Sequence, residues 1–279
     1  MNISKTLIVS HDAGGAFLLS KWCRDFRHKA EFEYHLKGPA IKIFKDVMPS
    51  IEVLEDVVWN KVTRVITATG WQTEFEISTI EKAKENGIYV VSYLDHWANY
   101  MERFSHNGSV ILPDEIWLAD REAMKVANNV FSKHSIKLRF IRNRHFSEIK
   151  LAVSNAPQKK DSVLICLEPI RNGYSLKEAY KVLKSHLINN YNEGKKIIIR
   201  DHPAGVDTGS GYLSQELSET FDVEFSKNTL EIDIANAERV YGYQSSVLAY
   251  ASYLSVDVFS YYPKYLYEVI LPHKDISYI

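Results

Sequence analysis

The segment around residue 12 combines acid–base side chains with glycine. His11 and Asp12 follow a short apolar run, and Gly14 and Gly15 come shortly after them. A carboxylate or an imidazole can take a proton from a reacting hydroxyl, and glycine lets the backbone turn tightly and approach a ligand closely. A helix predicted from Phe17 would add unpaired N–H groups that attract an anion or a hydroxyl. This segment is therefore a candidate ligand-binding loop; the alternative is that Asp12 caps the helix and the glycines serve only the turn.

A second polar loop spans residues 67–74 and contains Gly70 and Glu74. It combines a glycine turn with hydroxyls, an indole, an amide and a carboxylate, which together are typical of a surface that faces a sugar. Thr73 and Glu76 also have the spacing of a capping box, in which both side chains serve the N-terminus of a helix. Both interpretations of this loop stay open.

The next predicted strand ends in Asp95 and His96, and Trp97 and Tyr100 follow. Aromatic and short polar side chains at the carboxyl end of a strand face a ligand more often than they enter the core. We therefore predict that this segment contributes to the same site.

A basic run stands out against the neutral average of the chain. It contains Lys133, His134, Lys137, Arg139, Arg142, Arg144 and His145. If a strand over 138–142 ends at the site, Asn143 and Arg144 could contact an acidic sugar. The alternative is that the run is a solvated face or contacts an anionic membrane surface, which would allow peripheral association with the inner membrane.

Two loops in the second half follow the first two predicted strands there. Glu168 could accept hydroxyls of a ribose or another sugar, or it could be an exposed loop carboxylate. Arg200 and His202 lie two residues apart, so on an extended backbone both point to the same side, where they could bind a phosphate. Pro203 then fixes the turn.

A third loop in this half carries Gln244, Ser245 and Ser246 before an apolar helix. Serines at a helix N-terminus can cap it, and they can equally place hydroxyls and N–H groups around a phosphate. The pairing of a His-Pro after one strand with a Ser-Ser after a later one favours a phosphate-binding edge.

Composition narrows the class of protein. The 279 residues include 34 Lys+Arg and 35 Asp+Glu, so no global positive field attracts nucleic acid. Cys23 and Cys166 are the only cysteines, too few for a disulfide scaffold or a cysteine-ligated zinc. A secretion signal and a membrane-spanning apolar stretch are both unsupported, which predicts a cytoplasmic, soluble protein.

Short β-branched runs alternate with helical patterns, which predicts parallel α/β layers. Strands are predicted over 6–10, 31–36, 64–68, 88–94, 115–119, 138–142, 162–167, 196–200, 223–226, 239–243 and 256–261. Helices are predicted over 78–86, 121–132, 175–191 and 245–254. Residues 147–160 are polar enough for an exposed connection, which divides the chain into two doubly wound domains, 1–150 and 151–279. Ligands are expected where the carboxyl ends of the strands meet along a shared cleft.

The order of these motifs resembles that of the bacterial sialyltransferases and polysialyltransferases of the GT-B fold and, more loosely, of capsule Kdo and glycerophosphate transferases. The matching residues are Asp12-Ala13-Gly14-Gly15, His202-Pro203 and Ser245-Ser246. The resemblance implies two Rossmann-like domains that face a central cleft, the first binding the acceptor and the second binding the nucleotide sugar.

The resemblance also implies roles for individual residues. Asp12 would be the general base, His202 would contact the donor phosphate and support the departing nucleotide, and Ser245 and Ser246 would hold the same phosphate. The donor would be a CMP-activated nonulosonic acid, which is a sialic acid-like sugar, or Kdo. The acceptor would be a hydroxyl of a surface glycan or a protein, and neither a metal nor another cofactor is expected.

One departure from the family leaves the base open. The family has two carboxylates before the glycine, whereas this chain has one, so Asp95, Glu74 and His11 are rivals to Asp12. The alternative functions are a nucleotide-sugar hydrolase or epimerase on the same plan, a UDP- or GDP-sugar GT-B transferase, and a non-enzymatic two-lobed protein that binds a small molecule.

Overall fold

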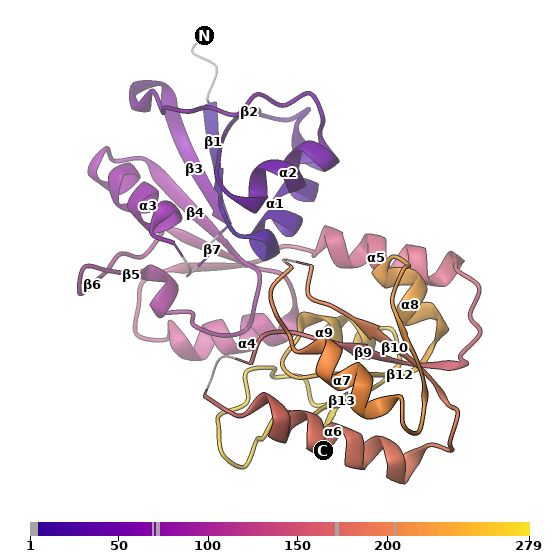
Figure 1. Ribbon diagram of the computed structural model, residues 1–279. Helices are drawn as coiled ribbons and strands as arrows, with labels where there is room; N and C mark the ends of the chain where they lie inside the picture. The colour runs from indigo at the N-terminus through magenta and orange to yellow at the C-terminus, as the bar shows by residue number, and fades with distance from the viewer. Residues whose placement is uncertain (1–4, 69, 71–72, 171–172, 204) are drawn as a thin grey trace. The chain divides into compact units, whose positions relative to one another are not determined.

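The computed structural model describes residues 5–68, 70, 73–170, 173–203 and 205–279 (Figure 1). The chain forms two compact units, Met1–His145 and Phe146–Ile279. Each unit contains one parallel six-stranded sheet, so the predicted α/β fold is confirmed.

The first unit has the strand order β2-β1-β3-β4-β7-β8. Its strands are β1 (Lys5–Ser10), β2 (Glu31–Leu36), β3 (Val62–Ala68), β4 (Tyr89–Leu94), β7 (Glu115–Leu118) and β8 (Lys137–Phe140), with a short antiparallel pair, β5 (Ser105–His106) and β6 (Ser109–Val110). Its helices are α1 (Ala13–Phe26), α2 (Pro39–Val47), α3 (Phe75–Glu85) and α4 (Arg121–Val130), with single 3-10 turns at Trp59–Lys61 and Glu102–Phe104.

Both faces of the first sheet are covered, and its central strands β1, β3 and β4 are buried along most of their length. Ile8, Ile66 and Val91 pack in one cluster with α1 and α2, whereas α3 contacts β1, β3 and β4 on the opposite face (Figure 1). The chain leaves β1 toward β2 and returns to β3 on the other side of β1. This reversal makes the carboxyl ends of β1 and β3 the switch point where ligands bind in such sheets.

The second unit has the strand order β11-β10-β9-β12-β13-β14. Its strands are β9 (Ser162–Cys166), β10 (Lys196–Arg200), β11 (Asp222–Phe225), β12 (Ala237–Gly242), β13 (Asp257–Ser260) and β14 (Ile276–Tyr278). Its helices are α6 (Leu176–Asn190), α7 (Ser210–Leu217), α8 (Leu230–Asn236) and α9 (Ser246–Tyr253), and α5 (Arg144–Asn155) begins just before the unit. Val163, Ile165 and Ile199 pack with α6 and α7, while α8 and α9 contact the sheet around β12.

Two predicted features differ from the structure. Helix α1 begins at Ala13, so Gly14 and Gly15 lie in its first turn and not in a turn before Phe17. The predicted exposed connection 147–160 is largely helix α5, because Ile149 and Val153 are spaced by one helical turn and are buried. Within the described part of the chain, no helix has the length and apolar character needed to cross a membrane.

Candidate active site

Asp12, Gly14, Gly70 and Asp95 come together at the carboxyl edge of the first sheet. Asp12 follows β1, Gly70 follows β3 and Asp95 follows β4. A Cβ placed on Gly70 would overlap the Asp12 carboxylate, and one placed on Gly14 would overlap the Asp95 carboxylate. The two glycines therefore provide the space in which the two carboxylates lie. Gly15 packs in the same way against Ala68 at the end of β3.

Asp12 stands at the N-cap position of α1, yet its side chain makes no capping hydrogen bond. Its Oδ1 lies 2.8 Å from His11 Nδ1, and its side chain is 16% exposed. If Nδ1 carries the proton of a neutral ring, His11 donates to Asp12 and keeps a lone pair on Nε2. The pair can therefore accept a proton from a bound hydroxyl through either residue.

Asp95 is tied to a buried cation. Its Oδ1 lies 2.7 Å from Arg103 Nη1, and the Arg103 side chain is 5% exposed. Arg103 also donates from Nε to the carbonyl of Ala98 at 3.3 Å. One oxygen of Asp95 is thus engaged in an ion pair, and the other lies against the first turn of α1.

Glu76 belongs to this cluster and does not form the capping box with Thr73 that its spacing allowed. The N-cap of α3 is Glu74 without a side-chain hydrogen bond, and Glu76 is 1% exposed with Oε1 accepting the His11 N–H at 2.6 Å. Burial raises the pKa of Glu76 to about 7; the His11 N–H opposes this rise, and the charge of Asp12 adds to it. Glu76, Ile80 and Ala83 share a helix face at spacings of four and three, and this pattern could have shown that Glu76 points inward.

Other residues predicted for this site have different surroundings. Glu74 has a side chain that is 77% exposed, with Oε1 3.9 Å from His106 Nδ1. His96 is half-buried, and its ring centroid lies 5.2 Å from that of Trp97. Arg144 Nε lies 3.4 Å from Asp25 Oδ2 on α1, and Asn143 beside it is half-buried.

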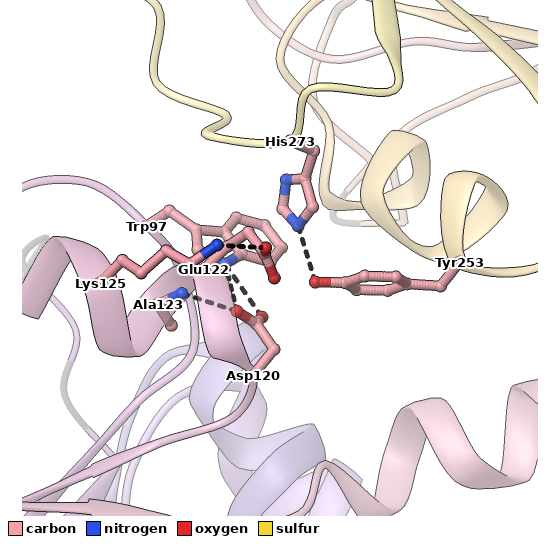
Figure 2. A network of polar contacts seen from close by, with 7 residues as sticks. All are labelled: Trp97, Asp120, Glu122, Ala123, Lys125, Tyr253 and His273. Atoms are coloured by element: carbon pink, nitrogen blue, oxygen red, sulfur yellow. Dashed lines mark hydrogen bonds and ion pairs between the residues drawn. The ribbon is translucent and has the colours of Figure 1, made fainter.

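The prediction that the aromatic residues after β4 face a ligand is wrong for Trp97 and Tyr100, which are both buried. Trp97 Nε1 donates to the Asp120 carboxylate at 2.9 and 3.1 Å, and Asp120 caps α4 by accepting the Ala123 N–H at 2.6 Å (Figure 2). The indole has its polar atom satisfied by a helix cap, so these rings contribute to the core of the unit.

In the second unit, Glu168 and Gln244 connect the ends of two neighbouring strands. The Glu168 carboxylate accepts the backbone N–H of Gln244, and the buried Gln244 side chain accepts the Leu271 N–H at 3.3 Å. Ser245 caps α9, because its Oγ accepts the Val247 N–H at 3.3 Å, and Ser246 is the first residue of the helix. The edge after β9 and β12 is therefore ordered by side chains that were predicted to bind a sugar or a phosphate.

Arg200 is paired within the second unit. Its Nη1 lies 2.9 Å from Asp233 Oδ2 and donates to Ser226 Oγ at 3.1 Å. His202 follows it and is half-buried, whereas Pro203 is exposed. The guanidinium of Arg200 thus points toward α8. Of the two residues predicted to bind a phosphate, Arg200 and His202, only His202 is not held by these contacts.

His273, a buried histidine, is not among the residues that the sequence predicts for a site. His273 Nε2 lies 3.1 Å from the Tyr253 hydroxyl of α9 (Figure 2). This contact holds the segment after β13 against the end of α9. The distance between the residues in sequence explains why no local pattern indicated it.

Comparison with known proteins defines the class of fold. A scan against protein-family models finds no match, and a search of curated proteins finds none. Similar solved structures include the UDP-GlcNAc 2-epimerase from Neisseria meningitidis bound to UDP-GlcNAc (TM-score 0.61, 10% identity, 88% of this chain and 78% of that one). Another is Anabaena HepE in complex with UDP and glucose (TM-score 0.57, 12% identity, 92% of this chain and 80% of that one). A third is a UDP-glucosyltransferase from Polygonum tinctorium (TM-score 0.54, 9% identity, 93% of this chain and 80% of that one).

These neighbours are GT-B-type nucleotide-sugar enzymes, and the two Rossmann-like units of this chain have the GT-B type of fold. At this level of identity the likeness shows the fold alone. None of the three is a sialyltransferase, so the choice of nucleotide and sugar rests on the residues of the site.

Proposed function

We propose that this protein is a GT-B enzyme that uses a nucleotide-activated sugar, and that it is a metal-independent, inverting glycosyltransferase. The observation that supports this most is the cluster of His11, Asp12, Asp95 and Glu76 at the switch point of the first sheet. Such a cluster supplies the acid–base chemistry that glycosyl transfer needs, on a fold shared with enzymes whose structures hold UDP or UDP-GlcNAc.

Asp12 is the proposed general base, with His11 as its partner. The acceptor hydroxyl gives its proton to this pair while its oxygen forms a bond to the anomeric carbon of the donor. The bond from that carbon to the nucleotide phosphate oxygen breaks, and the phosphate leaves with the electron pair. Two of the rivals are weaker candidates, because Glu74 is mostly exposed and one oxygen of Asp95 is held by Arg103.

The second unit is proposed to bind the donor. The N–H groups at the start of α9, with Ser245, Ser246 and His202, would stabilise the negative charge that develops on the phosphate. Glu168 and Gln244 would orient sugar hydroxyls beside them. From the resemblance of the His-Pro and Ser-Ser motifs, the donor is proposed to be a CMP-linked nonulosonic acid or Kdo, and the acceptor a glycan or protein hydroxyl.

An epimerase or hydrolase of a nucleotide sugar is the second candidate. It is favoured by the likeness to UDP-GlcNAc 2-epimerase and by the presence of three carboxylates in one cluster, more than a single deprotonation requires. Such an enzyme would change the donor without any acceptor, whereas a transferase would need one.

The test begins with thermal unfolding in the presence of CMP, UDP, GDP and ADP, each with EDTA or with Mg²⁺, since a ligand that binds only the folded state raises the Tm. Stabilisation by CMP that EDTA leaves unchanged supports the CMP-sugar transferase. Stabilisation by UDP alone would mean that the donor is a UDP-sugar and not a CMP-sugar. The next assay would then compare UDP-sugars with and without an acceptor. If no nucleotide raises the Tm at saturating concentration, the proposed function is refuted.

A further inference from the structure

We propose that a hollow beside the carboxylate cluster binds an uncharged sugar and presents its hydroxyl to Asp12; this rests on the proposed function and names its acceptor class. The hollow has a volume of about 560 Å³ and lies within the first unit. This is in the range of small-ligand sites, about 300 to 1,000 Å³. It is lined by the end of β2, the first turns of α3 and the segment 55–59.

Two aromatic side chains give the hollow flat apolar surfaces. Trp59 and Phe75 are both half-buried; Lys82 lies over the Trp59 ring and Lys37 over the Phe75 ring, so a ligand would use the part of each ring that these lysines leave open. The edge and face of a sugar ring carry C–H groups that pack on such surfaces, while its hydroxyls need polar partners around the rim. Ser78 of α3 is exposed on the same wall and supplies a hydroxyl, whereas the buried Thr79 hydroxyl beside it donates to the Phe75 carbonyl at 2.8 Å.

The charges of the lining favour an uncharged ligand. The Lys37 ammonium lies 4.7 Å from the Phe75 ring centroid, and the Lys82 ammonium lies 5.5 Å from that of Trp59. Three carboxylates, those of Glu55, Asp56 and Glu74, line the same hollow as these two lysines. A carboxylate or phosphate on the ligand would meet more negative than positive side chains, whereas neutral hydroxyls can both donate to the carboxylates and accept from the lysines.

Hydrogen bonds connect the wall of the hollow directly to the loop that carries Asp12. The Lys37 N–H donates to the Ser10 carbonyl at 3.0 Å, and the Ala40 N–H donates to the His11 carbonyl at 3.1 Å. Gly38 lies against the His11 ring, where a Cβ would come within 2.6 Å of Nε2. Phe75 precedes Glu76, which accepts the His11 N–H. His11 and Asp12 are not lining residues of the hollow, so these backbone contacts are what connect its wall to the loop that carries them.

Saturation-transfer NMR with the 279-residue chain tests this inference. The neutral probes are methyl β-glucoside, methyl β-galactoside and N-acetylglucosamine, and the acidic probes are glucuronic acid and N-acetylneuraminic acid. The native protein is expected to transfer saturation to one or more neutral probes and much less to the acidic ones. Equal or stronger transfer to the acidic probes would overturn the inference.

Variants locate the binding to the hollow. Trp59→Ala is expected to weaken the neutral probe about tenfold through loss of a stacked ring. Ser78→Trp starts from an exposed position and fills the hollow, so it tests the same point even if Trp59→Ala does not fold. Tyr212→Ala is the matched control, because Tyr212 is a partly exposed ring of the second unit with the Lys177 ammonium 5.9 Å from its centroid. Neutral-probe binding that survives Ser78→Trp unchanged would overturn the inference.

Nucleotide binding by the same variants separates this inference from the proposed function. If a nucleotide raises the Tm but no neutral probe binds, the hollow is not the acceptor site and the proposed function stands. If neutral probes bind and Ser78→Trp removes them while no nucleotide binds, the hollow is a sugar site and the proposed function falls.

Discussion

Glu76→Gln is predicted to make the first unit more stable, and increasingly so as the pH rises. Glu76 is buried and, among the described residues, forms no ion pair with a lysine or arginine, so its charged form is costly in the folded state. A glutamine keeps the oxygen that accepts the His11 N–H at 2.6 Å and removes the titration. The variant therefore imitates the protonated glutamate at every pH.

The size of the effect follows from proton linkage. The pKa of Glu76 is raised from 4.5 to about 7, so between these values the folded state binds more protons than the unfolded state. The free energy of unfolding is then highest at a pH below the ordinary pKa of 4.5, and it falls as the pH rises through the raised pKa of about 7. Between about pH 5 and about pH 8 the loss amounts to about 2.5 kcal/mol, and Glu76→Gln should recover it.

Urea unfolding of the 279-residue chain, followed by tryptophan fluorescence, measures this change in the free energy of unfolding. All five tryptophans lie in the first 145 residues, so the signal reports on the first unit. The difference in free energy of unfolding between variant and native protein should grow by about 2.5 kcal/mol from about pH 5 to about pH 8.

Glu115→Gln is the control with the opposite sign. Burial opposes the ionisation of Glu115, but hydrogen bonds from Trp117 and Tyr89 and the charge of Arg139 outweigh it and lower the pKa of this carboxyl. Glu115 is therefore ionised in both states above about pH 5, and its substitution should destabilise by a constant amount from there to about pH 8. A difference for Glu76→Gln that is equally constant would refute the reasoning.

Three further substitutions test the site. Asp12→Asn should leave the Tm near that of the native protein and lower kcat about 10² to 10⁴-fold in a transfer assay, as loss of a general base does; native-like turnover would move the base elsewhere. His202→Ala should weaken nucleotide affinity in calorimetry more than it lowers the Tm, and unchanged affinity would leave His202 a structural residue. Gly70→Ala should displace the Asp12 carboxylate, which is the flexible end of a side chain, so turnover should fall while the Tm changes little; full activity would contradict the contact.

The sequence predicted the elements that are determined by local composition. The bounds predicted for β2 and β10 coincide with the observed ones, because runs rich in aromatic or β-branched residues are bounded there by charge or glycine. The rule that ligands bind after the carboxyl ends of parallel strands predicts Asp12 and Asp95 at the same edge, where the structure has them. Helix α2 (Pro39–Val47) was missed, although a proline at its first position and its apolar spacing were present in the sequence.

What the sequence did not show depends on contacts between distant segments. Glu76 looked like half of a capping box because its partner, the His11 N–H, lies 65 residues earlier. Trp97 looked like a ligand-facing indole because its acceptor, Asp120, lies 23 residues later in the chain, where it is the N-cap of α4. Arg200 looked like a phosphate ligand because Asp233 is brought to it only by the packing of α8. In each case the polar partner is specified by tertiary structure.

The Glu76 carboxylate destabilises the folded state, and this cost supports a role for Glu76 in the chemistry of the site. Burial and the charge of Asp12 disfavour the charged form of Glu76, and a glutamine would accept the same N–H without that cost. Folding alone therefore gives no reason for a carboxyl group at this position. A carboxyl group that titrates near neutral pH and touches the backbone of the His11–Asp12 pair would instead place a pH-dependent charge beside the site. The expected signature is that Glu76→Gln gains stability at pH 8 and alters the pH profile of turnover, and a stabilised variant with a native pH profile would assign Glu76 a purely structural role.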